Sequence, residues 1–299
     1  MITVTKLHPL FMAEIGSVDL TQPVSASDYA AIDDAFNTHA VLVFRGQPVT
    51  EAQQVAFSKH FGPLIPTTNY HRKGEKQRLR AELADVSNID HENNMLPVDS
   101  ERRQHSLGNQ LWHTDASFKH VPARCSLLAA HEVPPTGGET EFADMRAAFD
   151  ALPQARKDEI EDLVVEHSIY RSRERMGFTG YNEATRAELP PVQQVLVRTH
   201  PGSGRKTLYL AAHASHVLGW PLEKGQALMD ELIAHATQPQ FTYAHHWQVG
   251  DVVMWDNRCT MHRARPYEDL KYRRDMRRST VSDEINTVEA RRGPLADAV

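Results

Sequence analysis

The stretch LWHTDASF, residues 111–118, places a histidine and an aspartate two positions apart, at His113 and Asp115. Side chains two residues apart on a β-strand project from the same face, so this spacing directs an imidazole and a carboxylate toward one point. The pair matches two of the three protein ligands of a 2-His-1-carboxylate iron centre, which keeps open coordination positions. Taken alone, such a pair is more often part of a half-exposed strand, so the metal hypothesis needs a third ligand.

The chain has 17 histidines, and His262 is distinguished by the residues that precede it. In DVVMWDNRCTMH, an apolar strand at 252–255 is followed by a polar turn at 256–258 and then by this histidine. A ligand carried on rigid structure is suited to metal binding. A hydrogen-bonded structural histidine is the alternative at this position.

A basic segment, RRDMRRSTV, follows shortly after and predicts an anion site. The strand period of two places Arg274, Met276, Arg278 and Thr280 on one face. The methionine indicates that this face points inward. Buried guanidinium groups need anionic partners, and a guanidinium binds a carboxylate through two parallel hydrogen bonds. Two inward arginines therefore indicate two carboxylates, whereas a solvated edge strand with charges on both faces is the alternative.

The elements that must position these residues are mostly short strands. An apolar strand and turn are predicted at 41–49, between helices that begin at Ser25 or Ser27 and at Thr50; the second helix is expected to end at Gly62. Residues 63–99 are polar and broken, which predicts mobile loops that cover a site. From Leu111 onward many short strands alternate with Pro and Gly turns and a few helices. This pattern predicts a mainly β, α+β fold: a jelly roll (double-stranded β-helix) with flanking helices.

Composition narrows the class of protein. With 299 residues, 40% hydrophobic and 24% charged, the chain can bury a sizeable core, and we expect one domain over 1–299. The net charge of −6 argues against a nucleic-acid partner. No long apolar span and no signal-like N-terminus are present, so we expect a cytoplasmic protein without membrane association. The two cysteines, Cys125 and Cys259, are expected to be reduced packing residues.

Several segments together resemble the taurine dioxygenase / 2,4-dichlorophenoxyacetate dioxygenase (TauD/TfdA) family of Fe(II)- and 2-oxoglutarate-dependent oxygenases. They occur in the family's order from about Leu7 to about Asp283: VLVFRGQPV, FSKHFGPL, NQLWHTDASF, PPTGGETEFADMRAAFDALP, GSGRKTLYLAAHASH, GDVVMWDNRCTMHRARPY and RRDMRRST. Among these, MRAAFDALP, AHASHV and MWDNRC are closer to the herbicide-degrading branch than to the taurine branch. The resemblance implies the jelly-roll core with a long insertion between the strands that carry the metal ligands.

The resemblance also implies roles for matching residues. Arg274 would bind the distal carboxylate of 2-oxoglutarate, helped by the hydroxyl of Thr140. Because the segment between His262 and Arg274 is slightly longer than in the taurine branch, Arg273 is an alternative to Arg274. The three implied ligands of Fe(II) are His113, Asp115 and His262.

For the primary substrate, the resemblance implies that Arg278 binds its acidic group. Asn109 and Ala116 match substrate-contact positions of the family. Within the expected lid, residues 63–99, Tyr70 and His71 are our candidates for contact with an aryl ring, and a simple surface loop is the alternative. His200, His213 and His216 are expected to be structural, although one of them could reach the substrate.

The implied reaction hydroxylates an aryloxyalkanoate, such as 2,4-dichlorophenoxyacetate, at the carbon beside the ether oxygen. With O₂ and 2-oxoglutarate as cosubstrates, the products are a phenol, glyoxylate, succinate and CO₂. A sulfonate or another aromatic acid is an alternative substrate, because one arginine suits either anion. A zinc hydrolase and a non-catalytic jelly-roll binding protein are alternatives from other classes, and a homo-oligomer would be ordinary for the family.

Overall fold

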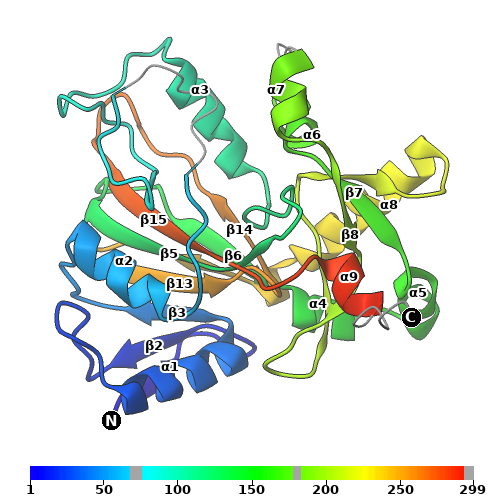
Figure 1. Cartoon of the computed structure of the whole chain (residues 1–299), viewed down its shortest axis with the longest axis horizontal. Helices are drawn as coiled ribbons and strands as arrows, with labels where there is room; N and C mark the ends of the chain where they lie inside the picture. The colour runs from blue at the N-terminus through cyan, green and yellow to red at the C-terminus, as the bar shows by residue number, and fades with distance from the viewer. Residues whose placement is uncertain (68–75, 178–182, 293–299) are drawn as a thin grey trace, which may run out of the picture.

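The computed structural model describes residues 1–67, 76–177 and 183–292 and has an α+β architecture, as the sequence predicted (Figure 1). The largest of its sheets is mixed: β2 (Ala13–Gly16) runs parallel to β3 (Val41–Phe44), and the other pairs are antiparallel. In order across the sheet, its seven strands are β1 (Thr3–Lys6), β2, β3, β13 (Val252–Asp256), β5 (Ala123–Glu132), β15 (Asp275–Ser282) and β4 (Ala84–Asp85).

The central strand β13 is buried on both faces, because its apolar side chains alternate between two clusters. Val252 and Met254 pack in the cluster that also contains residues of α1 (Ala26–His39) and α2 (Glu51–Lys59). Val253 and Trp255 pack in a second cluster with Phe142. One face of the sheet is therefore covered by two helices, and the other faces a smaller sheet.

The two helices begin where side-chain caps satisfy their first backbone N–H groups. Ser25 accepts a hydrogen bond from the backbone of Asp28, so it is Ser25 rather than Ser27 that caps α1. Thr50 and Gln53 form a reciprocal capping box at the start of α2. This second helix ends at Lys59, three residues before the predicted Gly62.

The smaller sheet facing the large one consists of β12 (Thr242–His245), β6 (Thr140–Asp144) and β14 (Thr260–Ala264). Between β6 and β12 the chain forms a long insertion with two further sheets. One contains β11 (Ala214–Val217), β7 (Val164–His167) and β8 (Val192–Val195), and the other pairs β9 (Val197–Thr199) with β10 (Lys206–Leu208).

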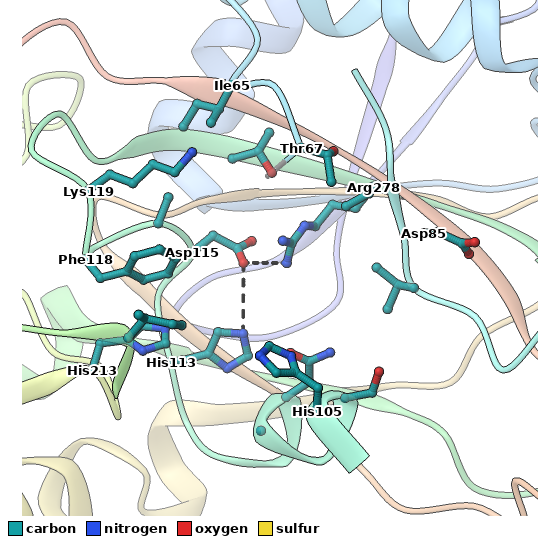
Figure 2. A pocket seen from close by; sticks show the side chains of 18 of the residues that line it. Ile65, Thr67, Asp85, His105, His113, Asp115, Phe118, Lys119, His213 and Arg278 are labelled. Atoms are coloured by element: carbon teal, nitrogen blue, oxygen red, sulfur yellow. Dashed lines mark hydrogen bonds and ion pairs between the residues drawn. The ribbon is translucent and has the colours of Figure 1, made fainter. Parts of the chain in front are cut away.

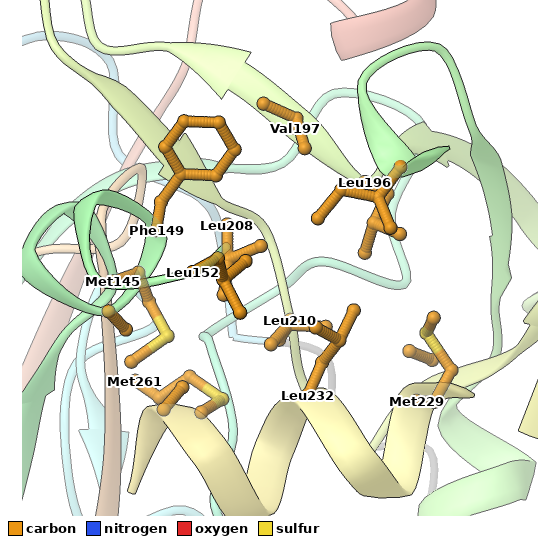
Figure 3. Close-up of a cluster of buried hydrophobic side chains, with 14 of the residues drawn as sticks. Met145, Phe149, Leu152, Leu196, Val197, Leu208, Leu210, Met229, Leu232 and Met261 are labelled. Atoms are coloured by element: carbon orange, nitrogen blue, oxygen red, sulfur yellow. The ribbon is translucent and has the colours of Figure 1, made fainter. Parts of the chain in front are cut away.

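The insertion has a hydrophobic cluster of its own (Figure 3). Leu228, Met229 and Leu232 of α8 (Leu222–Ala236) pack there with Leu208 of β10, and Met261 of β14 joins them. This cluster fixes the insertion against the strand that carries His262. The remaining helical elements are α3 (Glu101–Ser106), η1 (Leu107–Gln110), α4 (Met145–Asp150), α5 (Gln154–Ile160), α6 (Ile169–Glu174), α7 (Glu183–Glu188), η2 (Pro239–Phe241) and α9 (Thr287–Arg292).

Residues 76–99 differ from the mobile loop that their polar sequence predicted. Strand β4 in this segment pairs with β15, and Leu79 and Leu83 are buried. Arg78 binds both Asp85 and Asp275, with Nη2–oxygen distances of 2.8 and 2.6 Å. Polar residues can order a segment in this way when oppositely charged groups pair under partial burial, which a polarity pattern does not reveal. In the described part of the chain, none of the helices is long and apolar enough to cross a bilayer.

Candidate active site

The structure brings His113, Asp115 and His262 together at one buried point. One ligand atom from each lies within 4.8 Å of the others. Nε2 of His113 lies 4.0 Å from Oδ1 of Asp115, and Nε2 of His262 lies 3.8 Å from Oδ2. The two histidines come from distant parts of the chain and are joined by a two-residue backbone bridge, with N–O distances of 3.0 and 2.8 Å.

The prediction that His113 and Asp115 project from the same face of one β-strand is wrong. His113 forms only the isolated bridge to His262, and Asp115 begins a turn rather than sharing a strand face with it. The turn requires left-handed backbone at Ala116, whose φ is 53°, and it closes with the Lys119 amide 2.9 Å from the Ala116 carbonyl. The side chains of His113 and Asp115 therefore converge without sharing a strand face, and Asp115 is held by contacts with Asn257 and Ser126.

Burial and charge set the protonation states of these three residues. Burial lowers the pKa of both His113 and His262, which keeps the imidazoles neutral. For Asp115, burial opposes ionisation, but the charge of nearby Arg278 and the hydrogen bond from Ser126 hold its pKa below the usual value. Neutral imidazoles and a carboxylate are the forms that bind a divalent cation.

The hydrogen bonds also suit a metal centre. His113 Nδ1 lies 2.8 Å from the Leu111 carbonyl, and when this nitrogen carries the proton, Nε2 is the free ligand atom that faces Asp115. Asp115 is held by Ser126, whose Oγ donates to Oδ2 at 2.7 Å. The donor set of two imidazoles and one carboxylate is that of non-haem Fe(II) oxygenases and leaves coordination positions for other ligands. The residues present therefore fit Fe(II).

Two cavities meet at this point and share His113, Asn109 and Arg278 as lining residues. We call them the β14-side cavity and the turn-side cavity. The β14-side cavity has a volume of about 330 Å³ and is also lined by Thr140 and Arg274. The turn-side cavity, of about 180 Å³, is lined by Asp115 and by residues that follow it, Ala116, Phe118 and Lys119 (Figure 2). Arg278 lies between the two.

Arg274 is a buried cation in the wall of the β14-side cavity. Its Nε has no hydrogen-bond partner among the residues that the structure describes, and Nη1 donates to the Val86 carbonyl at 3.3 Å. Burial lowers the pKa of this arginine, so an anion bound there would be favoured. Thr140 already accepts a hydrogen bond from Trp247 at 3.0 Å, which leaves its own hydroxyl proton to donate.

Arg273 lies outside the cavity, although the sequence left it as an alternative to Arg274. Its Nε donates to Glu132 at 3.0 Å, and its Nη2 donates to Asn93 at 2.8 Å. Arg278 extends from β15, and its Nη1 contacts Oδ1 of Asp115 directly. Tyr70 and His71 lie outside the described residues.

Asp115 is held by two residues that were not predicted from the sequence, Asn257 and Ser126. Asn257 accepts the Asp115 backbone N–H at 3.1 Å and donates to Ser126 Oγ at 3.0 Å. Its amide oxygen also accepts from Trp255 Nε1 at 3.1 Å. Two sequence signals could have found them: Ser126 is a polar residue inside the apolar strand CSLLAA, and Asn257 lies in the polar turn after β13.

The histidines that were expected to be structural divide into two groups. His200 is buried and bonds Asp256 at 2.9 Å, which agrees with a structural role. His216 lies beside Ser215, 3.0 Å from its hydroxyl. His213 instead lines the turn-side cavity while its Nδ1 lies 3.0 Å from Ser172 Oγ. The two thiols, Cys125 and Cys259, are buried, and burial raises the pKa of both, as expected of packing residues.

Comparison with known proteins identifies the family. The model of the family described as "Taurine catabolism dioxygenase TauD, TfdA family" matches residues 3–280. The chain belongs to this family. It is 47% identical over 278 residues to an alpha-ketoglutarate-dependent 2,4-dichlorophenoxyacetate dioxygenase of Cupriavidus pinatubonensis, covering 93% of this chain and 96% of that protein.

Two further likenesses extend the family assignment. An enzyme of the same name from a Burkholderia species is 45% identical over 275 residues, covering 92% of each chain. The crystal structure of AAD-2 in complex with Mn(II) and N-oxalylglycine superposes on this TauD/TfdA-family chain with a TM-score of 0.89 and 44% identity, covering 96% of this chain and all of the other. The resemblance inferred from sequence motifs is thereby confirmed.

Proposed function

We propose that this protein is an Fe(II)- and 2-oxoglutarate-dependent dioxygenase that hydroxylates an aryloxyalkanoate such as 2,4-dichlorophenoxyacetate at the carbon beside the ether oxygen. The single observation that carries the proposal is that two cavities meet at the His113, Asp115 and His262 cluster, with Arg278 in the wall of both and the buried Arg274 in the wall of one. One cavity suits a dicarboxylate cosubstrate and the other an organic acid. The names of the two curated relatives support the choice of substrate.

In this proposal His113, Asp115 and His262 hold Fe(II), which supplies the activation of O₂ coupled to decarboxylation of 2-oxoglutarate. Arg274 and Thr140 bind the distal carboxylate of 2-oxoglutarate, because both have hydrogen-bond donors free in the β14-side cavity. Mn(II) and N-oxalylglycine, present in the AAD-2 crystal structure, support a divalent metal together with an oxalyl-containing acid in this fold.

The primary substrate occupies the turn-side cavity in this proposal. Arg278 binds its carboxylate, and Asn109 and Ala116 contact the rest of the molecule. Anchoring the carboxylate positions the neighbouring carbon for reaction. Hydroxylation of that carbon gives a hemiacetal, which loses the phenol and leaves glyoxylate, so no separate hydrolase is needed.

We also infer that the large sheet and the β12–β6–β14 sheet form the jelly-roll core and that residues 1–299 make one domain. Phe142 of β6, Val41 of β3 and Trp255 of β13 share one hydrophobic cluster, which joins the two sheets. The family match runs from residue 3 to 280 without division. Residues 63–99 are proposed as the lid: among those that the structure describes, Ile65 and Thr67 line the turn-side cavity, Asn88 lines the β14-side cavity and Val86 lines both.

An oxygen-uptake assay with Fe(II) and 2-oxoglutarate tests the function. We expect 2,4-dichlorophenoxyacetate to stimulate O₂ consumption and to yield succinate and 2,4-dichlorophenol in equal amounts. Aryloxypropionates, sulfonates and other aromatic acids are assayed in parallel, so a different best substrate would correct the substrate class and keep the chemistry. Full substrate-dependent succinate formation by folded His113→Ala or Asp115→Ala protein would overturn the assignment of the metal ligands.

A further inference from the structure

Lys119 is held in a fixed position by the same turn that carries Asp115. Gln194, which is buried, donates from its Nε2 to the backbone carbonyls of Ser117 at 3.2 Å and Lys119 at 3.0 Å. Thr287 in turn donates to the Gln194 amide oxygen at 2.6 Å. The backbone of Lys119 is therefore anchored from two other parts of the chain, so its side chain starts from a rigid base.

The side chain of Lys119 enters the turn-side cavity together with that of Arg278. Figure 2 shows Lys119 reaching in from the segment after Phe118, whereas Arg278 enters from β15. The two cations interact. Burial lowers the pKa of Lys119, and the positive charge of Arg278 lowers it further. Like charges directed into one half-buried cavity are unfavourable unless an anion binds between them.

The three acidic residues of the described cavity wall, Glu82, Asp85 and Asp115, are paired with cations other than Lys119, and Asp115 is paired with Arg278 itself. Glu82 lies 3.6 Å from Arg80 and 3.9 Å from Lys59. Asp85 is bound by Arg78 and by Arg102, the latter at 2.7 Å. Within residues 1–67, 76–177 and 183–292, no hydrogen bond or ion pair of the Lys119 ammonium group is found.

Arg278 offers a substrate carboxylate only the Nε–Nη2 edge of its guanidinium group. Its Nη1 is bound to Asp115, and its Nε is buried with no partner in the described part of the chain. A substrate carboxylate has two oxygens. When it binds the free part of the Arg278 guanidinium group, the side of the carboxylate that faces away from Arg278 can still accept hydrogen bonds. The ammonium group of Lys119, which has no partner among the described residues, can donate to the carboxylate from that side.

We propose that Lys119 is a substrate-binding residue that shares the carboxylate of the primary substrate with Arg278. This inference rests on the proposed function and adds the second cation of the acid site. The carboxylate lies between one cation from the turn after Asp115 and one from β15, and the aryl ring extends along the cavity wall formed by Phe118 and His213. Two cations select an ionised acid over a neutral molecule of the same shape.

Calorimetric binding measurements test this inference without requiring turnover. Wild type, Lys119→Gln and Lys119→Arg are each saturated with Mn(II) and N-oxalylglycine and titrated with 2,4-dichlorophenoxyacetate. The neutral analogue 2,4-dichlorophenoxyethanol is titrated in parallel. We expect Lys119→Gln to weaken acid binding about tenfold or more and to leave binding of the alcohol within about twofold. Lys119→Arg should retain most of the affinity for the acid.

The control is Lys224→Gln, an exposed lysine of α8 that lies over Trp220, and it should bind the acid as wild type does. Unchanged affinity for the acid in Lys119→Gln would overturn the inference. An equal loss of affinity for the acid and the alcohol would also overturn it, because that pattern indicates a structural role. The same holds if the wild-type protein does not bind the acid. The oxygen-uptake assay separates these results from a failure of the proposed function, since that assay is scored on the wild type alone.

Discussion

Ser126, which lies among the apolar residues CSLLAA of β5, donates a hydrogen bond from its Oγ to Oδ2 of Asp115 at 2.7 Å. Asn257 supports this contact from the end of β13, donating to the same serine oxygen and accepting the Asp115 backbone N–H. The carboxylate is thus oriented by two strands of the large sheet, although it lies in a turn. This arrangement would orient the carboxylate precisely for the metal-ligand role that we propose.

Ser126→Ala is expected to weaken Fe(II) binding about tenfold, because partners that orient a ligand typically contribute tenfold to a hundredfold to metal affinity. The measurement is a titration of the metal-free protein with Fe(II) or Mn(II). Ser117→Ala is a matched control: Ser117 is also buried and two residues from Asp115, but its hydroxyl has no hydrogen-bond partner among the described residues. Equal metal affinity in wild type and Ser126→Ala would contradict this prediction.

Arg274→Met is expected to raise the KM for 2-oxoglutarate about thirtyfold or more, because the variant lacks the buried cation proposed to bind the distal carboxylate. The KM for the primary substrate should change far less. The neighbouring Arg273→Met removes an arginine that binds Glu132 and Asn93 outside the cavity, so it serves as the control. If Arg273→Met impaired 2-oxoglutarate binding more than Arg274→Met did, the two roles would have to be exchanged.

Arg278→Gln is expected to weaken binding of the primary substrate about tenfold or more, and to affect 2-oxoglutarate less. Arg278 also contacts Asp115, so its removal should raise the pKa of that carboxyl toward the ordinary value. Separate titrations with each substrate, at saturating metal, distinguish the effects. The assignment of the two arginines fails if 2-oxoglutarate binding is the more strongly impaired.

Local patterns predicted the parts of the site that lie on regular strands. β13, β14 and β15 were visible as apolar or alternating runs, and His262 lies on β14 after a buried strand, as expected. Arg274 was assigned by strand parity, yet it precedes β15, and the register shifts between Asp275 and Met276. Its position in the cavity depends instead on Asn88, whose side chain accepts the Arg274 backbone N–H at 2.8 Å.

What the sequence could not reveal depends on contacts between distant residues. Left-handed backbone at Ala116 carries no signal, because the residue is not a glycine, so the turn that positions Asp115 was read as a strand. Lys119 reads as an ordinary surface lysine until the turn and Gln194 place it in the cavity. The order in residues 76–99 likewise depends on ion pairs to β15, which lies about two hundred positions away along the chain.

The buried His167 of β7 is expected to make the folded protein less stable in acid. Its side chain is 0% exposed, and neither ring nitrogen has a hydrogen-bond partner within the described ranges. Burial lowers its pKa to about 3, so the folded protein keeps this imidazole neutral, whereas the unfolded chain protonates it near pH 6.5. Below about pH 6.5 the unfolded state therefore binds the extra proton, and stability is lost as the pH falls from there toward 3.

Replacing His167 with Phe is expected to remove this contribution to acid sensitivity. Between pH 7.5 and pH 5 the wild type should lose about 2 kcal/mol more unfolding free energy than the variant, because each pH unit below 6.5 contributes about 1.4 kcal/mol. Urea unfolding at both pH values measures the difference, and His167→Gln checks that added volume is not the cause. His120→Phe, at an exposed histidine, should retain the full wild-type loss. Parallel decreases in all four proteins would show that other groups control the acid response.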